Sequence, residues 1–369
     1  MRVYLDNAAT TQLLPEVFEA MRPYFLAQYG NPGGFHAFSR VAHRAIDDAR
    51  AAVASRLGAK PDELVFTGGG SEGDNLILRG AVSRGAHVIT SAIEHPAVLE
   101  TLFALRRAGD ISLSVLPVDR FGRVDPDAVA AAILPETQLV SVMLANNEVG
   151  TIEPIRRIAD VCHARGVLLH TDAVQAVGQV PVDVNALGCD YLTLAAHKFH
   201  GPKGVGAAYI RAGAPMRALI TGGEQERKRR AGTENVPGIV GMAKALELAA
   251  AGLAENAARM TALRNRLIAG VSKTGAALSG HPTERLPNNA HFVFDGVRSE
   301  TLLMRLDMAG IAASAGSACT AGSLEPSHVL LAMGYSPEQA RCALRLTLSP
   351  LTTEAEIDET VAVLGRISI

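Results

Sequence analysis

Short apolar segments alternate with amphipathic helical patterns from residue 64 to residue 210. The segments are rich in aliphatic residues, and glycine, proline or charged residues bound most of them. They lie at 64–67, 87–90, 111–118, 137–145, 167–171, 191–196 and 205–210. This alternation predicts an α/β fold built on one mostly parallel, seven-stranded sheet.

Two stretches, 139–144 and 191–196, are apolar without clean alternation. Strands that helices cover on both faces have this pattern. Ligands of such sheets bind outside the carboxyl ends of the strands. We therefore expect the functional residues just after the predicted strands.

The last third of the chain predicts a smaller α+β unit. A long helical pattern over 240–273 is expected to connect the two units, with strands at 291–294 and 344–348. Further helices are predicted over 300–308 and after Thr353. We expect an N-terminal arm that packs with the small domain, a large cofactor-binding domain and a small C-terminal domain, at 1–14, 15–255 and 256–369.

The 369 residues are 48% hydrophobic and carry a formal charge of −2, so the chain can bury a large core. The balanced charge gives no bias toward nucleic acid or an anionic membrane. Apolar runs stop short of the roughly 18 residues of a membrane span, and the N-terminus shows no hydrophobic signal region. A cytoplasmic enzyme with no nucleic-acid or membrane partner is the expectation.

A lysine and an aspartate stand at the ends of two predicted strands. Lys198 follows segment 191–196, and Asp172 follows segment 167–171. Burial lowers the pKa of a lysine toward the range in which its neutral amine forms a Schiff base, and an aspartate is the usual partner of a pyridinium nitrogen. This pair predicts pyridoxal 5'-phosphate (PLP) as the cofactor. Lys203, the rival lysine, is expected in a turn beyond the strand.

The glycine-rich loop 68–73 follows the first strand and precedes a helical pattern. Backbone N–H groups at such a helix start predict an anion site. The same loop fits a dinucleotide fingerprint with Glu94 on the ribose, which would indicate an oxidoreductase. A plain glycine turn capped by Ser71 is the structural alternative. Because neither alternative accounts for Lys198 and Asp172, we favour a cofactor phosphate.

The four cysteines are far apart and form no Cys-x-x-Cys pair, which argues against disulfides and structural zinc. Cys319 lies among glycine, serine and alanine residues that lack the bulk to pack, so we expect an exposed, chemically active thiol. Cys162, Cys189 and Cys342 are expected to be structural. The histidine pairs lack the glutamate and the spacing of a helical zinc site, and no metal is predicted.

With these residues together, the chain resembles the cysteine desulfurases, PLP enzymes of the aminotransferase fold (fold type I, class V). The resemblance covers nearly the whole chain and places its catalytic cysteine loop in the small domain. The segments that carry it are YLDNAATT at 4–11, GNP at 30–32, EHPAV at 94–98, ANNEVG at 145–150, HTDAVQ at 170–175, HK at 197–198, RAGTEN at 230–235 and SACT at 317–320.

The resemblance implies a role for each residue in these motifs. Lys198 would bind PLP as a Schiff base, Asp172 would pair with the pyridinium nitrogen, and His95 would stack on the ring. Cys319 would receive the sulfur. The remaining implied contacts are Asn147 and Gln175 at the phenolic oxygen, Gly70, Ser71 and His197 at the phosphate, Thr233 at the phosphate of a neighbouring subunit, and Asn31 and Arg345 at the substrate carboxylate.

Two positions depart from the family pattern. Ala195 stands where the family usually has a serine that contacts the phosphate, and Ser71 replaces a commoner threonine. The basic run 227–230 lies beside Glu224 and Glu226, so we expect a solvated or interface loop rather than a nucleic-acid patch.

The implied activity converts L-cysteine to L-alanine and passes sulfur through a Cys319 persulfide to an iron-sulfur scaffold or another acceptor protein. The resemblance also implies a homodimer. A selenocysteine lyase or another PLP aminotransferase is the alternative within the fold. A dinucleotide oxidoreductase and a catalytically idle scaffold that binds sulfur-transfer partners are the alternatives outside that activity.

Overall fold

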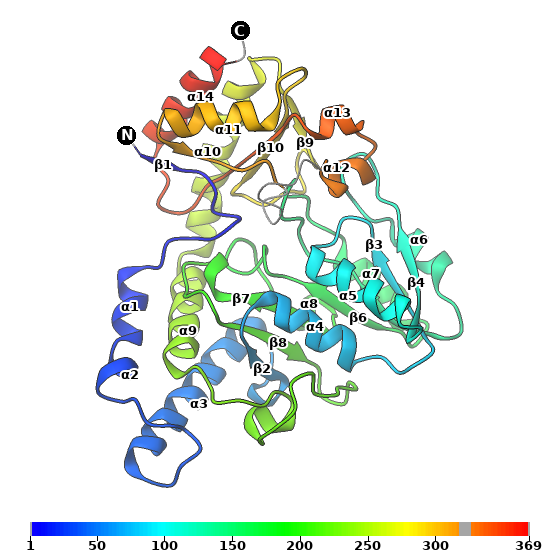
Figure 1. Cartoon of the computed structure of the whole chain (residues 1–369), viewed down its shortest axis with the longest axis vertical. Coiled ribbons are helices and arrows are strands. Elements are labelled where there is room, and N and C mark those ends of the chain that lie inside the picture. Colours follow the sequence, from blue (N-terminus) through cyan, green and yellow to red (C-terminus); the bar gives the residue numbers. More distant parts are fainter. Residues whose placement is uncertain (1, 317–325, 368–369) are drawn as a thin grey trace.

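The computed structural model describes residues 2–316 and 326–367, which form a large lobe and a smaller lobe (Figure 1). The large lobe is built around a seven-stranded sheet, and the small lobe carries the N-terminal strand, the last third of the chain and a sheet of its own. The predicted α/β architecture with a smaller α+β unit is confirmed. The exact domain limits at 14 and 255 stay predictions.

The large sheet has the strand order β2-β8-β7-β6-β5-β3-β4. Its strands are β2 (Leu64–Thr67), β3 (Ala86–Ser91), β4 (Ile111–Leu116), β5 (Thr137–Ser141), β6 (Leu168–Asp172), β7 (Tyr191–Ala195) and β8 (Gly206–Ile210). All pairs from β7 to β4 are parallel, whereas β8 is antiparallel to both of its neighbours. The prediction of seven mostly parallel strands is therefore confirmed.

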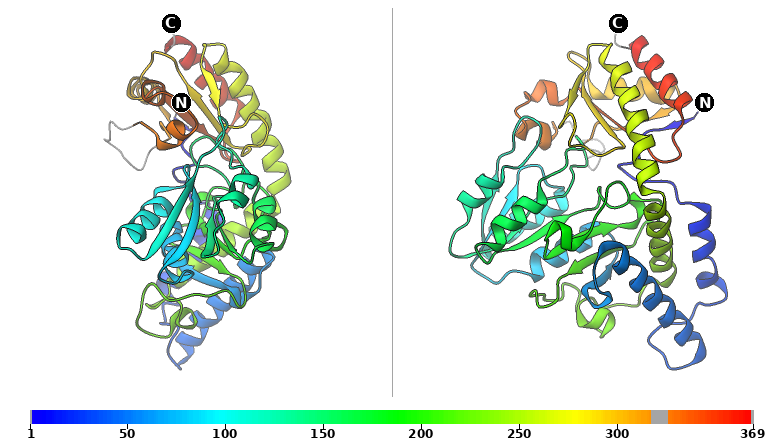
Figure 2. Two further views of the ribbon diagram at one scale, coloured as in Figure 1. Left: turned by 90° about the vertical axis from the view of Figure 1, so that its right-hand side faces the viewer. Right: turned by 180° about the vertical axis from the view of Figure 1, so that it is seen from behind.

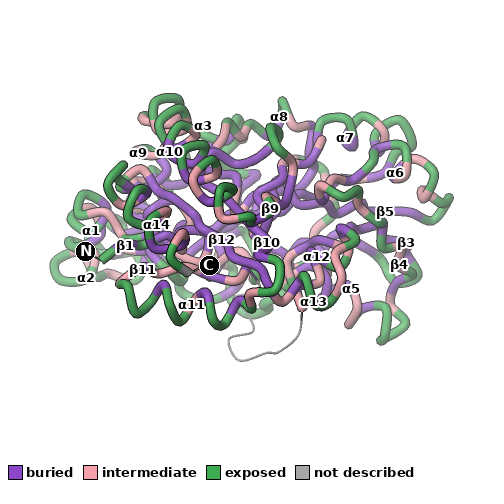
Figure 3. Tube along the Cα trace, turned by 90° about the horizontal axis from the view of Figure 1, so that it is seen from above, coloured by how far each residue is buried: buried purple, intermediate pink, exposed green. Residues whose placement is uncertain are grey.

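Helices cover both faces of this sheet, and its strands are buried except β4, which is partly exposed at one edge (Figure 3). The large-lobe helices are α1 (Pro15–Met21), α2 (Pro23–Leu26), α3 (Ala37–Leu57), α4 (Gly70–Gly80), α5 (Pro96–Arg107), α6 (Pro126–Ala132), α7 (Ile155–His163), α8 (Val184–Leu187) and α9 (Val236–Ala251). One core cluster joins the sheet to α3, α7 and α9, and the other joins it to α4 and α5.

The predicted strand 137–145 is too long, because β5 ends at Ser141. The chain turns instead around Asn146, whose side-chain oxygen accepts hydrogen bonds from the backbone N–H groups of Glu148 and Val149. Residues 142–145 are nevertheless buried, which explains their apolar character. Val142 and Leu144 still donate their N–H groups to the carbonyls of His170 and Asp172 on β6, and the Asn146 turn follows.

The single long helix predicted over 240–273 is wrong, because two helices meet there at a 72° bend. α9 ends before Gly252, and α10 (Leu253–Ser272) begins after it. Glycine is a poor helix former, and the bend lets α9 pack on α3 while α10 runs into the small lobe (Figure 2). Within the described residues, no single helix meets the length and hydropathy of a membrane span, and only this bent pair does so jointly.

The small lobe contains a three-stranded antiparallel sheet in the order β12-β10-β9. A two-stranded parallel sheet, β1 with β11, attaches the N-terminal arm to this lobe. The elements are β1 (Val3–Tyr4), β9 (Ala277–Ser279), β10 (Asn289–Val293), β11 (Ile311–Ala312), β12 (Ala343–Thr347), α11 (Ser299–Met308), α12 (His328–Ala332), α13 (Pro337–Ala340) and α14 (Glu354–Ile367). β1, β9 and β11 were not predicted, since two or three residues are too few to show an alternation of apolar and polar positions.

Candidate active site

A cavity of about 260 Å³ lies at the carboxyl edge of the large sheet, where β6 and β7 end and α4 begins. It collects residues that are far apart in the sequence, as expected for the carboxyl ends of parallel strands. All but one of the residues predicted to bind the cofactor line it: Gly70, Ser71, His95, Asn147, Asp172, Gln175, Ala195, His197 and Lys198.

Asp172 is the last residue of β6 and lies beside Thr193 of β7. Its Oδ1 accepts a hydrogen bond of 2.8 Å from the N–H of Val174. Burial raises the pKa of Asp172 to about 6, although that N–H and the charge of Lys198 oppose the shift. A cationic ring nitrogen in the cavity would lower this pKa again, so the carboxylate suits a pyridinium partner.

Lys198 ends the one-turn helix η2 (Ala196–Lys198), which directly follows β7. Its Nζ donates hydrogen bonds to the carbonyl oxygens of Ala8 and Ala9, at 2.5 and 2.9 Å. The arm is held there because Thr11 donates hydrogen bonds from its N–H and its hydroxyl to the carbonyl of His197. Sequence reasoning placed the arm on the small lobe and missed this contact with the cavity.

The start of α4 supplies the anion-binding end of the cavity. Gly70 and Ser71 form its first turn, and an added Cβ on Gly70 would lie 2.8 Å from Cγ2 of Val174. Free N–H groups at the start of an eleven-residue helix favour a phosphate. His197 completes this end as a neutral ring, since burial and the charges of Lys198 and Lys203 lower its pKa to about 4.

His95 caps α5 and faces the same cavity. Its Nδ1 accepts a hydrogen bond of 3.1 Å from the N–H of Ala97, so the neutral ring carries its proton on Nε2. Burial, with the charges of Lys198 and His328, lowers the pKa of His95 to about 4. The ring is therefore neutral at neutral pH and able to stack on an aromatic cofactor.

Glu94 lies in the interior, and this contradicts the dinucleotide alternative. Its side chain is fully buried and accepts hydrogen bonds from Ser91 Oγ at 2.5 Å and from the N–H of Met143 at 3.0 Å. Burial raises the pKa of Glu94 to about 8. A carboxyl group enclosed in this way cannot reach a ribose in the cavity.

Arg345 lies on β12 and is buried. Its guanidinium pairs with Asp6 at 2.8 Å and donates to the carbonyl of Asn147 at 2.9 Å. Arg345 does not line the cavity itself, but it adjoins the wall through Asn147. Among the described residues, no cluster of three or more metal-binding side chains occurs.

Cys319 lies outside the described residues, but both ends of its segment are held near the cavity wall. The carbonyl of Gly316 accepts a hydrogen bond from Arg345 at 3.3 Å. On the other side, Ser327 Oγ donates to the buried carboxyl of Glu148 at 2.5 Å. The other cysteines, Cys162, Cys189 and Cys342, are buried thiols whose pKa burial raises, which makes them poor nucleophiles.

Two predicted residues lie away from this cavity within the single chain. Asn31 belongs to an exposed turn, where its Oδ1 accepts a hydrogen bond from the N–H of Gly33. Thr233 is exposed and lines a separate cavity of about 100 Å³. Their roles stay predictions.

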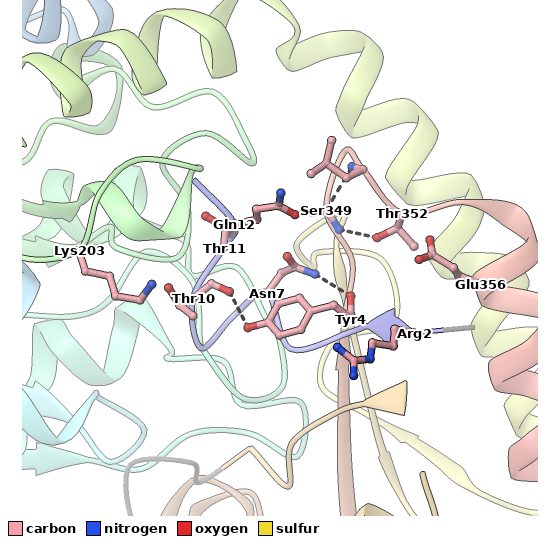
Figure 4. A pocket seen from close by; sticks show the side chains of 11 residues that line it. Arg2, Tyr4, Asn7, Thr10, Thr11, Gln12, Lys203, Ser349, Thr352 and Glu356 are labelled. Carbon is pink, nitrogen blue, oxygen red and sulfur yellow. Dashed lines mark hydrogen bonds between the residues drawn. The ribbon is translucent and has the colours of Figure 1, made fainter. Parts of the chain in front are cut away.

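Lys203, the rival lysine, faces a different cavity of about 480 Å³ (Figure 4). That cavity lies between the N-terminal arm and the connection from β12 to α14, where Tyr4 donates a hydrogen bond to the carbonyl of Thr10. It contains neither Asp172 nor the start of α4. Lys198 is thus the lysine that meets the acid and the anion site.

The aminotransferase class-V family model matches residues 3–360. Cysteine desulfurase IscS of Dictyoglomus turgidum is 47% identical over 99% of this chain and 94% of its own, and the IscS of Methanosarcina thermophila is 47% identical over 99% and 91%. A solved NifS-like protein superposes with a TM-score of 0.94 at 40% identity, covering 100% of this chain and 99% of the other.

The chain therefore belongs to the class-V aminotransferase family of PLP enzymes. Its curated relatives at this similarity are cysteine desulfurases, as the motif resemblance indicated.

The cavity fits PLP on its own chemistry. It offers a lysine for the aldehyde, a buried carboxyl for the ring nitrogen, neutral histidines and a helix start for the phosphate. Only hydrogen fits in place of a side chain at Gly70, where the first turn packs closely on Val174.

Proposed function

We propose that this protein is a PLP-dependent cysteine desulfurase that converts L-cysteine to L-alanine and transfers the sulfur to Cys319. The observation that carries the proposal is the meeting of Lys198 and Asp172 in one cavity that also contains the helix start that suits a phosphate. Full-length similarity to cysteine desulfurases supports the same activity.

PLP, when bound, withdraws electrons from the α-carbon of the substrate. Lys198 would hold the cofactor, and its amine would serve as the base that removes the α-proton of the substrate. Asp172 would keep the ring nitrogen protonated through its negative charge. His95 would pack against the ring, and His95 or Lys198 would return a proton to the substrate.

The sulfur step transfers one sulfur atom from the thiol of L-cysteine to the thiol of Cys319. The Cys319 thiolate attacks the sulfur of L-cysteine, the Cβ–S bond breaks, and its electron pair remains on Cβ, which takes a proton to give alanine. Cys319 becomes a persulfide, and two electrons from a reductant, or transfer to an acceptor thiol, return it to its starting state.

Arg345 is proposed to bind the carboxylate of L-cysteine by a bidentate fork. Its guanidinium already lies against the cavity wall at Asn147 and pairs with Asp6, a carboxylate that a substrate carboxylate can replace. Asn31 is proposed to assist from an adjacent subunit, since it lies on an exposed turn of its own chain.

A homodimer in the cytoplasm is part of this proposal. Exposed aromatic and aliphatic side chains gather where the chain runs from α2 into α3, which supports a protein-covered face: Phe25, Leu26, Tyr29, Phe35 and Phe38. An iron-sulfur scaffold or another thiol protein is the proposed sulfur acceptor.

The test is to quantify alanine and sulfide formed from L-cysteine with a reductant present. Lys198→Ala should lose both products and the yellow colour of the lysine-bound cofactor, whereas Cys319→Ser should stay yellow and release neither. Lys203→Ala and Cys342→Ser are the matched controls and should keep the activity. Full activity of Cys319→Ser would indicate a lyase that releases sulfur directly, and this result would contradict the proposal.

A further inference from the structure

The connection from β8 to α9 contains the basic run 227–230 in an unusual backbone conformation. Three consecutive non-glycine residues, Glu226, Arg227 and Lys228, have φ angles of 47°, 56° and 65°. This left-handed region is unfavourable for residues with a Cβ. Such strain persists only where the surroundings determine it, and it concentrates at functional segments.

Glu226 is the residue that holds this turn. Its buried carboxylate forms a two-pronged pair with Arg50 of α3, at 2.8 and 2.7 Å, and accepts the N–H of Phe66 at 3.0 Å. The Arg50 guanidinium also lies 4.7 Å from the centre of the Phe66 ring. A buried carboxylate with this many charge-assisted contacts fixes the position of its backbone.

A second pair holds the connection four residues later. Arg230 contacts Glu72 of α4 at 2.8 Å, and Glu72 also accepts the N–H of Gly68 at 2.8 Å. The connection is thus fastened at two points to β2 and α4, the elements that carry the anion site. Beyond Arg230 the chain leads to Thr233, which is exposed and shares a small cavity with Glu226 and Arg230.

We propose that the Arg50–Glu226 pair is a positioning device that presents Thr233 to the cofactor phosphate of a second copy of this chain. This inference rests on the proposed homodimer and on the proposed role of Thr233. The strained turn precedes the exposed segment that carries Thr233, and the buried ion pair compensates for the strain. Without the pair, the turn would relax and Thr233 would move from its place. Glu226 then acts on the neighbouring cofactor site rather than on its own.

Mixed dimers test this proposal, with two affinity tags to isolate them. In the first dimer, one chain carries Lys198→Ala and the other carries Glu226→Gln. The only reactive lysine then lies in the Glu226→Gln chain. The cofactor phosphate of that chain meets the Thr233 segment of the other chain, whose Arg50–Glu226 pair (the clamp) is intact. In the second dimer, Lys198→Ala and Glu226→Gln are in the same chain, and the partner is wild type. The reactive lysine now depends on a damaged clamp.

The readout is the dissociation constant of PLP, from the absorbance of the lysine-bound cofactor during titration. We expect the first dimer to match a dimer of Lys198→Ala with wild type, and the second to bind about tenfold more weakly, as for one lost phosphate hydrogen bond. Weaker PLP binding in the first dimer than in the second would show that the clamp acts on the cavity of its own chain through Glu72. Equal affinities in the two dimers would show that the clamp has no role in PLP binding. Either result overturns the proposal.

Three further variants in the second arrangement complete the test. Glu224→Gln is the matched control, because Glu224 pairs with Lys228 on the exposed side of the same turn, and no change is expected. Arg50→Lys, which keeps the charge but not the two-pronged contact, should weaken binding if Glu226→Gln fails to fold. Thr233→Ala should also weaken binding across the dimer. If Thr233→Ala weakens PLP binding but Glu226→Gln and Arg50→Lys do not, only the role of the clamp is refuted. If Thr233→Ala does not weaken PLP binding, the proposed role of Thr233 is refuted as well.

Discussion

Burial sets the charge of the residues around the candidate active site. His95 and His197 are both neutral at neutral pH, because burial lowers the pKa of each to about 4. Asp172 is buried as well, and its raised pKa makes a cationic ring nitrogen the partner it needs. The sequence identified these residues through their motifs, but protonation depends on neighbours that only the fold brings together.

Arg345 illustrates what a single sequence leaves open. Its place on an alternating strand is compatible with either face, and only the packing of β12 on β10 and the N-terminal arm shows that it is buried. Its contacts also reach Asn147 and Gly316, so one guanidinium links the cavity wall to the segment that precedes Cys319.

Replacing Arg345 with lysine should therefore raise the KM for L-cysteine by about tenfold to a hundredfold, because an ammonium cannot form the two-pronged contact. The visible spectrum of the bound cofactor should be unchanged. Steady-state kinetics with Arg298→Lys as the exposed control checks this, and an unchanged KM would contradict the role of Arg345.

Elements that are covered on both faces were the easiest to predict. The strands of the large sheet are short segments rich in aliphatic residues, so their existence followed from the sequence, but their ends did not. β5 ends at Ser141, before the turn at Asn146, and the helical pattern after Val240 hides the bend at Gly252. β1 and β11 form only because distant segments pair, which no local pattern reveals.

The first turn of α4 can be tested by a substitution at Gly70. Gly70→Ala places a methyl group 2.8 Å from Val174 Cγ2, so the first turn must shift away from the cavity and PLP affinity should fall by about tenfold or more. Gly365→Ala in α14 is the control, since no atom lies within 4 Å of the added Cβ. That variant should gain up to about 1 kcal/mol of stability. Unchanged PLP affinity of Gly70→Ala would argue against the phosphate role.

The buried carboxyl group of Glu94 lowers the free energy of unfolding of the protein at neutral pH. The pKa of Glu94 rises from 4.5 to about 8 on burial. Between these values the folded chain holds a proton that the unfolded chain does not, so the free energy of unfolding falls as pH rises through this window. The amide in Glu94→Gln can keep the contacts with Ser91 and Met143 without this penalty.

The stability of Glu94→Gln relative to the wild type should thus grow by about 1.4 kcal/mol per pH unit from about pH 5 to pH 8. Denaturant unfolding of both proteins without cofactor, at several pH values, measures this difference. The buried histidines contribute equally to the pH dependence of both proteins, so their contribution cancels in the difference. Parallel stability profiles would show that Glu94 is ionised in the folded protein.

In the proposed reaction, sulfur from L-cysteine passes to Cys319. The most direct measurement mixes the PLP-bound enzyme with one equivalent of L-cysteine without reductant, alkylates the thiols and examines the digested peptides by mass spectrometry. We expect the added mass of one sulfur atom on the Cys319 peptide, one alanine per modified site, and no added sulfur in the Lys198→Ala variant. Alanine formed with no sulfur on Cys319, or sulfur on Cys162, Cys189 or Cys342 instead, would contradict the proposed role of Cys319.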